Sequence, residues 1–317
     1  LYLSDKISIT PGARYEYINT TAEGFYGETP RNLAGDILEV RRTEEYRNNA
    51  RHLILGGIGV SYKPTYKINI YTNISQNYRS ITFSDMRVLN SSFVIDPNLK
   101  DERGYSFDLG LRSERTSFLI YDVSLFFLNY NNRIGEISSR DNSRIIRVRK
   151  NIGQATIMGI ESYIEADVFR IFFPSKENFS GVIFTNTAFT HSQYVRSELL
   201  RVEGNQVEFV PKVNLKTGVR LGYKKIKASF QHTYMSNQFS DATNEIEGGV
   251  SAVAGIIPAY SIMDLSLSYE YRRYKIEGSI NNLANQMYFT RRATGYPGPG
   301  ILPSDGRSFY LTLQVKI

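Results

Sequence analysis

The chain has 317 residues, a formal net charge of +7 and no cysteine. The lack of thiols excludes a disulfide framework, a zinc–thiolate site and a cysteine nucleophile. Hydrophobic residues make up 41% of the chain, including 23 Tyr and 18 Phe, which indicates an ordered protein. The arginines are spread along the chain rather than gathered in one stripe, which argues against a nucleic-acid partner. Because a guanidinium matches carboxylate and phosphate, an anionic small molecule or a lipid phosphate is the better expectation.

The dominant pattern is alternation of apolar and polar residues with a period of two, which is typical of β-strands. Met263, Leu265 and Leu267, for example, alternate with Asp264 and Ser266. About twelve strands are expected, and no helical pattern competes with them. The expected strands are 7–18, 53–63, 67–79, 103–113, 117–136, 144–167, 179–194, 207–223, 225–239, 259–271, 274–289 and 306–317.

Short and long connections alternate along the chain. Short ones follow Lys63, Ser113, Tyr223 and Tyr271. The long ones are 19–52, 80–102, 240–258 and 290–305. A transmembrane β-barrel has this arrangement, with short periplasmic turns and long extracellular loops.

The polar face of the strands also carries charges that a dry sandwich core would not tolerate, whereas a hydrated lumen would. These charged residues are Glu161, Glu165, Arg220, Glu270 and Glu277. Tyrosines at strand ends fit an aromatic girdle at the membrane interface. The pattern therefore predicts an all-β, antiparallel transmembrane β-barrel. A large soluble antiparallel β-protein is the alternative.

The last sixty residues resemble the C-terminus of TonB-dependent outer-membrane receptors. Pro258-Ala259-Tyr260 enters a strand that contains Asp264, and Asn281-Asn282-Leu283 precedes an aromatic residue. A loop rich in proline and glycine and a final strand follow. Further matching segments are 7–17, 57–75 and 151–166.

The resemblance implies a receptor of about 22 strands around an N-terminal plug that is preceded by a TonB box. Residues 1–317 would then be one barrel segment, about strands 11 to 22, with the plug and the TonB box absent from this chain. It implies a bacterial outer-membrane protein, not an enzyme, with lipid and lipopolysaccharide as neighbours. The TonB complex would be contacted through the plug. A self-contained twelve-stranded barrel is the alternative, since its strand number is even.

Within the family, one loop resembles the ferric-dicitrate receptor subgroup. Arg291-Arg292-Ala293 is followed there by Tyr296-Pro297-Gly298-Pro299-Gly300 and then by Pro303-Ser304-Asp305-Gly306-Arg307. The implied substrate is a ferric chelate, with ferric dicitrate the first choice. No resident cofactor or protein metal ligand is expected, because the citrate carboxylates already coordinate the iron. Arginine and hydrogen-bond donors would hold such an anion. The candidate binding residues are Arg291, Arg292, Tyr296, Gln76, Asn77, Arg79, Arg133, Arg140, Arg144, Arg147, Gln193 and Gln238.

Other interpretations stay open. The arginines could instead pair with lipopolysaccharide phosphates, or with nearby acids such as Asp141 and Glu136. The substrate could be another siderophore or an oligosaccharide, although the lack of tryptophan weighs against a sugar. A soluble β-rich adhesin or carbohydrate-binding module is the alternative of a different class.

Haem binding and direct ligation of iron by the protein have weaker support in the sequence. Haem receptors of the family carry an aromatic-Arg-Ala-Pro run, where this chain has Tyr78-Arg79-Ser80-Ile81. The histidines, at 52, 191 and 232, are not at ligand spacing.

Overall fold

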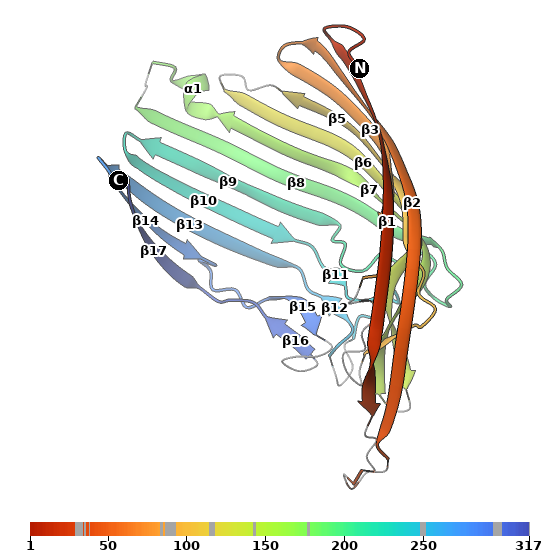
Figure 1. Ribbon diagram of the computed structural model, residues 1–317. Helices are drawn as coiled ribbons and strands as arrows, with labels where there is room; N and C mark the ends of the chain where they lie inside the picture. Colours follow the sequence, from red (N-terminus) through yellow and green to blue (C-terminus); the bar gives the residue numbers. More distant parts are fainter. Residues whose placement is uncertain are drawn as a thin grey trace.

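The protein forms one large curved antiparallel sheet, seen in a computed structural model (Figure 1). The structure describes residues 1–28, 34, 36–37, 39–82, 85, 93–113, 118–141, 144–175, 178–247, 252–293 and 300–316. Twelve strands follow one another in the order β1-β2-β3-β5-β6-β7-β8-β9-β10-β13-β14-β17. Neighbours in the sheet are therefore neighbours in the chain, as in an up-and-down barrel wall.

The strands of this path are long compared with those of most globular proteins. Their bounds are β1 Ile7–Glu28, β2 Arg41–Thr65, β3 Ile68–Arg79, β5 Glu102–Ser113, β6 Leu119–Asp141, β7 Arg144–Asp167, β8 Phe179–Arg196, β9 Val213–Tyr223, β10 Ile226–Met235, β13 Tyr260–Tyr271, β14 Tyr274–Asn281 and β17 Ser308–Val315.

Smaller elements decorate the sheet. The short strand β4 (Phe93–Ile95) pairs in parallel with β7. Two small sheets are made by β11 (Gln238–Phe239) with β12 (Ile256–Ile257) and by β15 (Phe289–Ala293) with β16 (Gly300–Pro303). A single-turn helix α1 (Val168–Phe172) precedes β8.

The two faces of the sheet differ in a way that water alone would not favour. In β13 the apolar Met263, Leu265 and Leu267 are exposed, while Asp264 and Ser266 are half-buried. In β17, at the edge of the sheet, both faces are exposed and Leu311 reaches 81%. Soluble proteins bury such side chains. An apolar face open to its surroundings and a polar opposite face are what a membrane-spanning strand requires. We call them the outer and the inner face.

The connections sort by length between the two ends of the sheet. The short turns, α1 and both chain termini lie at one end in Figure 1, and β11, β12, β15 and β16 lie toward the other. The alternation of short and long connections was therefore predicted correctly. Among the described residues, β1 pairs only with β2 and β17 only with β14, so these two strands form open edges.

Several strand boundaries differ from the expected ones. The first two strands run to Glu28 and start at Arg41, so most of the expected loop 19–52 is a strand hairpin. The expected strand 207–223 starts only at Val213. Pro211 cannot donate to a ladder and Phe209 has a positive φ of 58°, so the residues before β9 leave the sheet.

Two further expected strands are interrupted. Segment 225–239 divides into β10 and β11. Segment 274–289 ends at Asn281, because Asn282 has a φ of 52° and its side chain bonds with the backbone of Gln286. Helix α1 and strand β4 were not expected at all.

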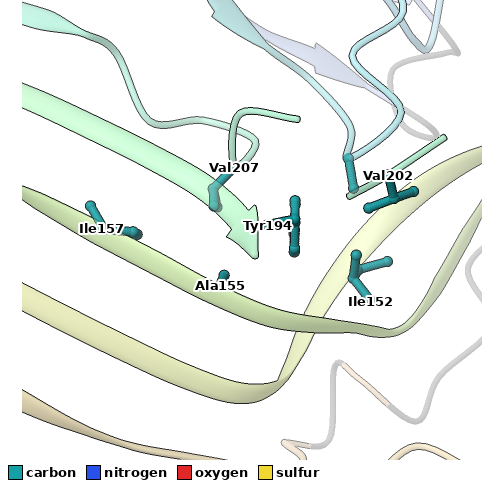
Figure 2. Packing of buried hydrophobic residues seen from close by; sticks show 7 residues of the cluster. Ile152, Ala155, Ile157, Tyr194, Val202 and Val207 are labelled. Atoms are coloured by element: carbon teal, nitrogen blue, oxygen red, sulfur yellow. The ribbon is translucent and has the colours of Figure 1, made fainter. Parts of the chain in front are cut away.

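A small core lies where residues 197–212 fold back over β7 and β8. Figure 2 shows the ring of Tyr194 among Ile152, Ala155, Val202 and Val207. Tyr194 and Val207 have no exposed surface. The backbone of Tyr194 bonds with Asn205 and Gly204, so the returning segment continues the ladder of β8. This end of the inner face is therefore filled by the chain itself.

The face assignment makes a direct prediction. Leu265→Arg should lower the free energy of unfolding in lipid vesicles by about 2–4 kcal/mol, because it places a charge on the outer face near mid-strand. Ser266→Arg, one residue along on the inner face, is the matched control and should cost far less. Equal losses for the two variants, measured by urea titration, would contradict the assignment.

Candidate functional site

Three of the predicted arginines meet at the end of the sheet that carries the long connections, together with Arg149, which was not predicted. Arg79 ends β3, while Arg133, Arg147 and Arg149 belong to the part of the β6–β7 hairpin beyond its irregular register. Three carboxylates lie among them, and we call the whole group the arginine network. Its acidic members are Asp85, Glu102 and Glu136.

Asp85 is fully buried and is the most heavily bonded of these acids. Arg79 Nη2 donates to both of its oxygens at 2.9 Å, and Arg149 Nη1 donates to Oδ1 at 3.1 Å. The amide and hydroxyl of Thr82 donate to Oδ2. Burial acts to raise the pKa of Asp85, but the Thr82 bonds and the two guanidinium charges outweigh it and hold the pKa below its usual range. The carboxylate therefore stays charged and ties β3 to β7.

Glu102 is the second buried centre. Its Oε1 accepts from Arg79 Nη1 at 3.1 Å and from the amide of Ile134 at 2.8 Å. Arg133 Nη1 lies 3.4 Å from Oε2. Both carboxylates thus hold Arg79 from different sides, and 39% of that side chain remains exposed.

Glu136 links the network to a second loop. It accepts from Arg147 Nη1 at 2.9 Å and from Arg149 Nη2 at 2.7 Å. Arg147 Nη2 also donates to the carbonyl of Ser240 at 2.7 Å. Because the Arg147 side chain is only 3% exposed, it joins the β6–β7 hairpin to residues 236–247 and is closed to a ligand in this conformation. Arg147 is therefore paired with the nearby acid Glu136, as the alternative interpretation of the arginines expected.

Arg292 has a comparable structural place. It is 8% exposed and donates to the carbonyls of Ala252 (2.8 Å) and Ile256 (2.7 Å). It therefore fastens the sheet β15–β16 to the preceding loop. Its neighbour Arg291 is exposed instead. The two adjacent arginines, predicted as a pair, are separated by strand parity into an anchored and an accessible one.

Gln76 and Asn77 line a hollow of about 150 Å³ between β2 and β5. Gln76 Oε1 accepts from the amide of Gly56 at 2.9 Å. Asn77 Nδ2 reaches the carbonyl of Asn129, while its Oδ1 is buried without a partner. Arg103 also lines this hollow, and it lines the next one as well.

That next hollow measures about 400 Å³ and contains cations that sequence reasoning missed. Arg51, Lys100 and Arg103 line it together with Asp101, which pairs with Arg51 at 2.8 Å. The missed residues lie inside expected loops or at strand starts, where alternation assigns no direction to a side chain. Arg149, also missed, is two residues from the predicted Arg147 and could have been found by strand parity.

The remaining predicted residues are dispersed. Gln193 lies on β8 beside the returning segment, and Gln238 is buried in β11. The side chains of Arg140 and Arg144 and the whole of Tyr296 lie outside the described residues.

A buried acid of different character lies in the returning segment. Glu208 Oε2 accepts from the hydroxyl of Tyr194 at 2.6 Å. A Cβ at Gly135 would lie 2.5 Å from Glu208 Oε1, so this close approach needs glycine. Burial raises the pKa of Glu208 above its usual range, against the opposing effects of the Arg133 charge and the Tyr194 hydrogen bond.

Chemically, the network can present guanidinium donors in fixed directions, as recognition of a carboxylate requires. Among the described residues, no group of three His, Asp or Glu side chains could hold a metal ion. No helix in the described ranges is long and apolar enough to cross a membrane.

Residues 1–283 match the sequence model of a protein family described as TonB dependent receptor-like, beta-barrel. The chain belongs to this family. As predicted, it is an outer-membrane β-barrel chain, and its family is one of receptors rather than enzymes. Among curated proteins, none matches the chain.

Solved receptor barrels share the fold at low identity. The ferric citrate transporter FecA superimposes with a TM-score of 0.74 and 19% identity, over 98% of this chain and 42% of that one. The ferric yersiniabactin uptake receptor FyuA from Yersinia pestis gives 0.71 and 18%, over 99% and 43%. The copper transporter OprC gives 0.72 and 12%, over 98% and 45%. The chain therefore spans less than half the length of each of these solved chains.

The network predicts a pH-dependent stability. Asp85→Asn should destabilise the protein locally by about 1–3 kcal/mol, because Arg79 and Arg149 lose a buried counter-charge but keep Glu102 and Glu136 as partners. In the unmodified protein the lowered pKa means that this contribution is present above the unfolded pKa of about 4 and is lost as the pH falls. Hydrogen exchange of peptides containing β4 and β7 would measure it. Unchanged protection in the variant at pH 7 would contradict the assignment.

Glu208 provides the opposite case. Glu208→Gln should leave the free energy of unfolding within about 1 kcal/mol at pH 7 or raise it, since the amide oxygen still accepts from Tyr194 and no charge is buried. The raised pKa also means that the unmodified protein gains stability as the pH falls through the folded pKa, and the variant should lack that gain. Denaturant unfolding at pH 5 and pH 7 would check both, with Asp85→Asn as the matched comparison.

Proposed function

We propose that this chain is the barrel portion of an outer-membrane uptake receptor for an anionic ferric chelate, with ferric dicitrate as the substrate. The single observation that carries the proposal is the arginine network. It gathers guanidinium groups at the end of the inner face where the long loops begin, and some of them are half-exposed. Support also comes from the Arg291-Arg292 loop and from the family, which implies ligand and TonB interaction generally.

The buried acids prepare these cations for an anion. Asp85 and Glu102 each bond one side of Arg79 and restrict its rotation, so the remaining N–H groups face a fixed direction. Arg133 shares Glu102 and is partly exposed as well. A carboxylate-rich chelate would then lose little further side-chain entropy on binding. The proposed contacts are Arg79, Arg133 and Arg291, with Arg147 and Arg292 as positioning residues for the loops.

We also propose that the open edges at β1 and β17 are closed by strands outside these residues, around a plug that carries the contact to TonB. The spans of the solved chains support this. Loops would close over the chelate, and energy delivered through the plug would open the path. No covalent step is required. Barrel-segment residues would thus contribute half of the binding site and none of the TonB contact.

The test is calorimetric titration of the purified receptor with ferric citrate. Arg291→Gln should weaken binding roughly 10-fold, because an exposed charge-assisted pair is lost without disturbing a buried network. Lys67→Gln, at the short-turn end, is the matched control and should bind as the unmodified receptor does. Ferric yersiniabactin and a copper salt serve as comparison ligands.

The outcomes separate the coarse proposal from the fine one. If another ferric chelate binds tightly and ferric citrate does not bind, ferric citrate is wrong as the substrate, but the proposal of an uptake receptor stands. If neither copper nor any of the ferric chelates binds, the proposal of an uptake receptor is itself wrong. Equal weakening by Arg291→Gln and Lys67→Gln would show that the effect is not local to the loop.

A further inference from the structure

Two adjacent hairpins at the short-turn end carry paired cations in their turns. Lys224-Lys225 connects β9 to β10, and Arg272-Arg273 connects β13 to β14. All four side chains are exposed. Within the described part of the chain, none of the four forms an ion pair with an acidic side chain. We call these four residues the turn cluster.

The backbone of both turns departs from what lysine and arginine prefer. Lys224 has a φ of 52° and Arg272 a φ of 53°. Glycine or asparagine adopts such angles at little cost and dominates two-residue hairpin turns, whereas long side chains are strained there. The same departure at two neighbouring turns indicates that the positive charge has a use.

The two turns form a single patch. Strands β10 and β13 are paired, and the amide of Glu270 donates to the carbonyl of Lys225 at 3.0 Å. The C-terminal strand joins the same edge, where the amide of Lys316 donates to the carbonyl of Arg273 at 2.8 Å. Lys316 Nζ pairs with the inner-face Glu270, so that acid is already engaged. The turn cluster therefore presents a continuous positive edge.

Tyrosine rings of the outer face lie directly beneath these charges. Lys224 Nζ lies 5.2 Å from the centroid of the Tyr223 ring. Lys225 Nζ and the Arg272 guanidinium lie 5.7 and 5.4 Å from that of Tyr271. Aromatic rings with a polar tip favour the depth at which a bilayer passes from acyl chains to headgroups. The cations thus stand one step further out, at headgroup level.

Helix α1 extends the same edge with apolar side chains. The rings of Phe169 and Phe179 are stacked with their centroids 6.0 Å apart, and the ring centroids of Phe179 and Tyr223 are 4.5 Å apart. Phe172 is 71% exposed. Exposed aromatic side chains beside unpaired cations combine the two features that bind a protein to an anionic membrane surface.

We propose that the turn cluster binds the headgroups of anionic phospholipids in the periplasmic leaflet of the outer membrane. Short turns of outer-membrane barrels face the periplasm, which places the cluster at that leaflet. Phosphodiester groups are the acceptors that lysine and arginine would meet there. A zwitterionic headgroup offers the same phosphate together with an opposing ammonium, so the site should discriminate by net charge. The proposal stands whatever chelate the receptor imports.

The test uses the receptor purified in detergent and native mass spectrometry. Phosphatidylglycerol and phosphatidylethanolamine of identical acyl chains are the probes. The unmodified receptor should retain phosphatidylglycerol in preference. The fourfold variant Lys224→Gly, Lys225→Asn, Arg272→Gly and Arg273→Asn should bind phosphatidylglycerol at least ~10-fold more weakly. Its melting temperature should be equal or higher, because Gly-Asn is a favoured hairpin turn, which separates lipid loss from misfolding.

Two controls complete the design. Lys224→Arg with Lys225→Arg keeps the charge and should keep the preference. Arg201→Gly removes an exposed arginine whose φ is 62° at the opposite end of the sheet, and should leave the preference intact. An unchanged phosphatidylglycerol preference in the folded fourfold variant overturns the proposal, as does equal retention of the two lipids by the unmodified receptor.

Discussion

A strand that crosses a bilayer has one face in hydrocarbon and one in a polar interior, and its side chains alternate between them. A shift of one residue in register would expose every charge of a strand to lipid. This constraint explains why Leu265 and Asp264 can be neighbours in sequence yet belong to different media. It also explains the simple strand order, since an antiparallel ladder satisfies each backbone group with its chain neighbour.

The constraint weakens where the strands leave the membrane. The β6–β7 pairing shifts between Tyr130 and Arg133, and the hairpin beyond that point has protein on both sides. There the chain builds an ordinary interior, with Tyr194 packed among aliphatic residues and carboxylates paired to arginines. Buried ion pairs are poor sources of net stability but costly to break. The ion pairs of Asp85 and Glu136 hold their connections in one arrangement, and Arg292 adds hydrogen bonds to backbone carbonyls of a third.

Sequence alone was sufficient wherever alternation governs. Strand 259–271 was expected within one residue of β13, and the inner-face charges Glu161 and Glu270 were assigned to the correct side. It was insufficient where a residue's partner lies far along the chain. Arg147 and Ser240 are 93 residues apart, and nothing in the local pattern connects them. The local sequence likewise predicts that Arg292 contacts a ligand, whereas in the structure it donates to the carbonyls of Ala252 and Ile256. Alternation predicts the face of the sheet to which a side chain points, whereas the burial of that side chain depends on which loop covers the face.

The two ends of the sheet therefore use the same residue types in opposite ways. At the long-loop end the arginines of the network are buried or half-buried, and buried acids neutralise and orient them. At the short-turn end Lys224 and Arg272 keep their charge unpaired, in backbone conformations that a smaller residue would adopt more easily. A guanidinium fixed by a buried carboxylate is suited to one shaped anion, since its free donors point in one direction. An exposed cation above a tyrosine ring is suited to a fluid layer of headgroups, where any phosphate can serve. Burial beside acids at one end and exposure at the other follow from the medium that each end meets. The difference in medium, not in residue type, therefore separates selective recognition from membrane anchoring.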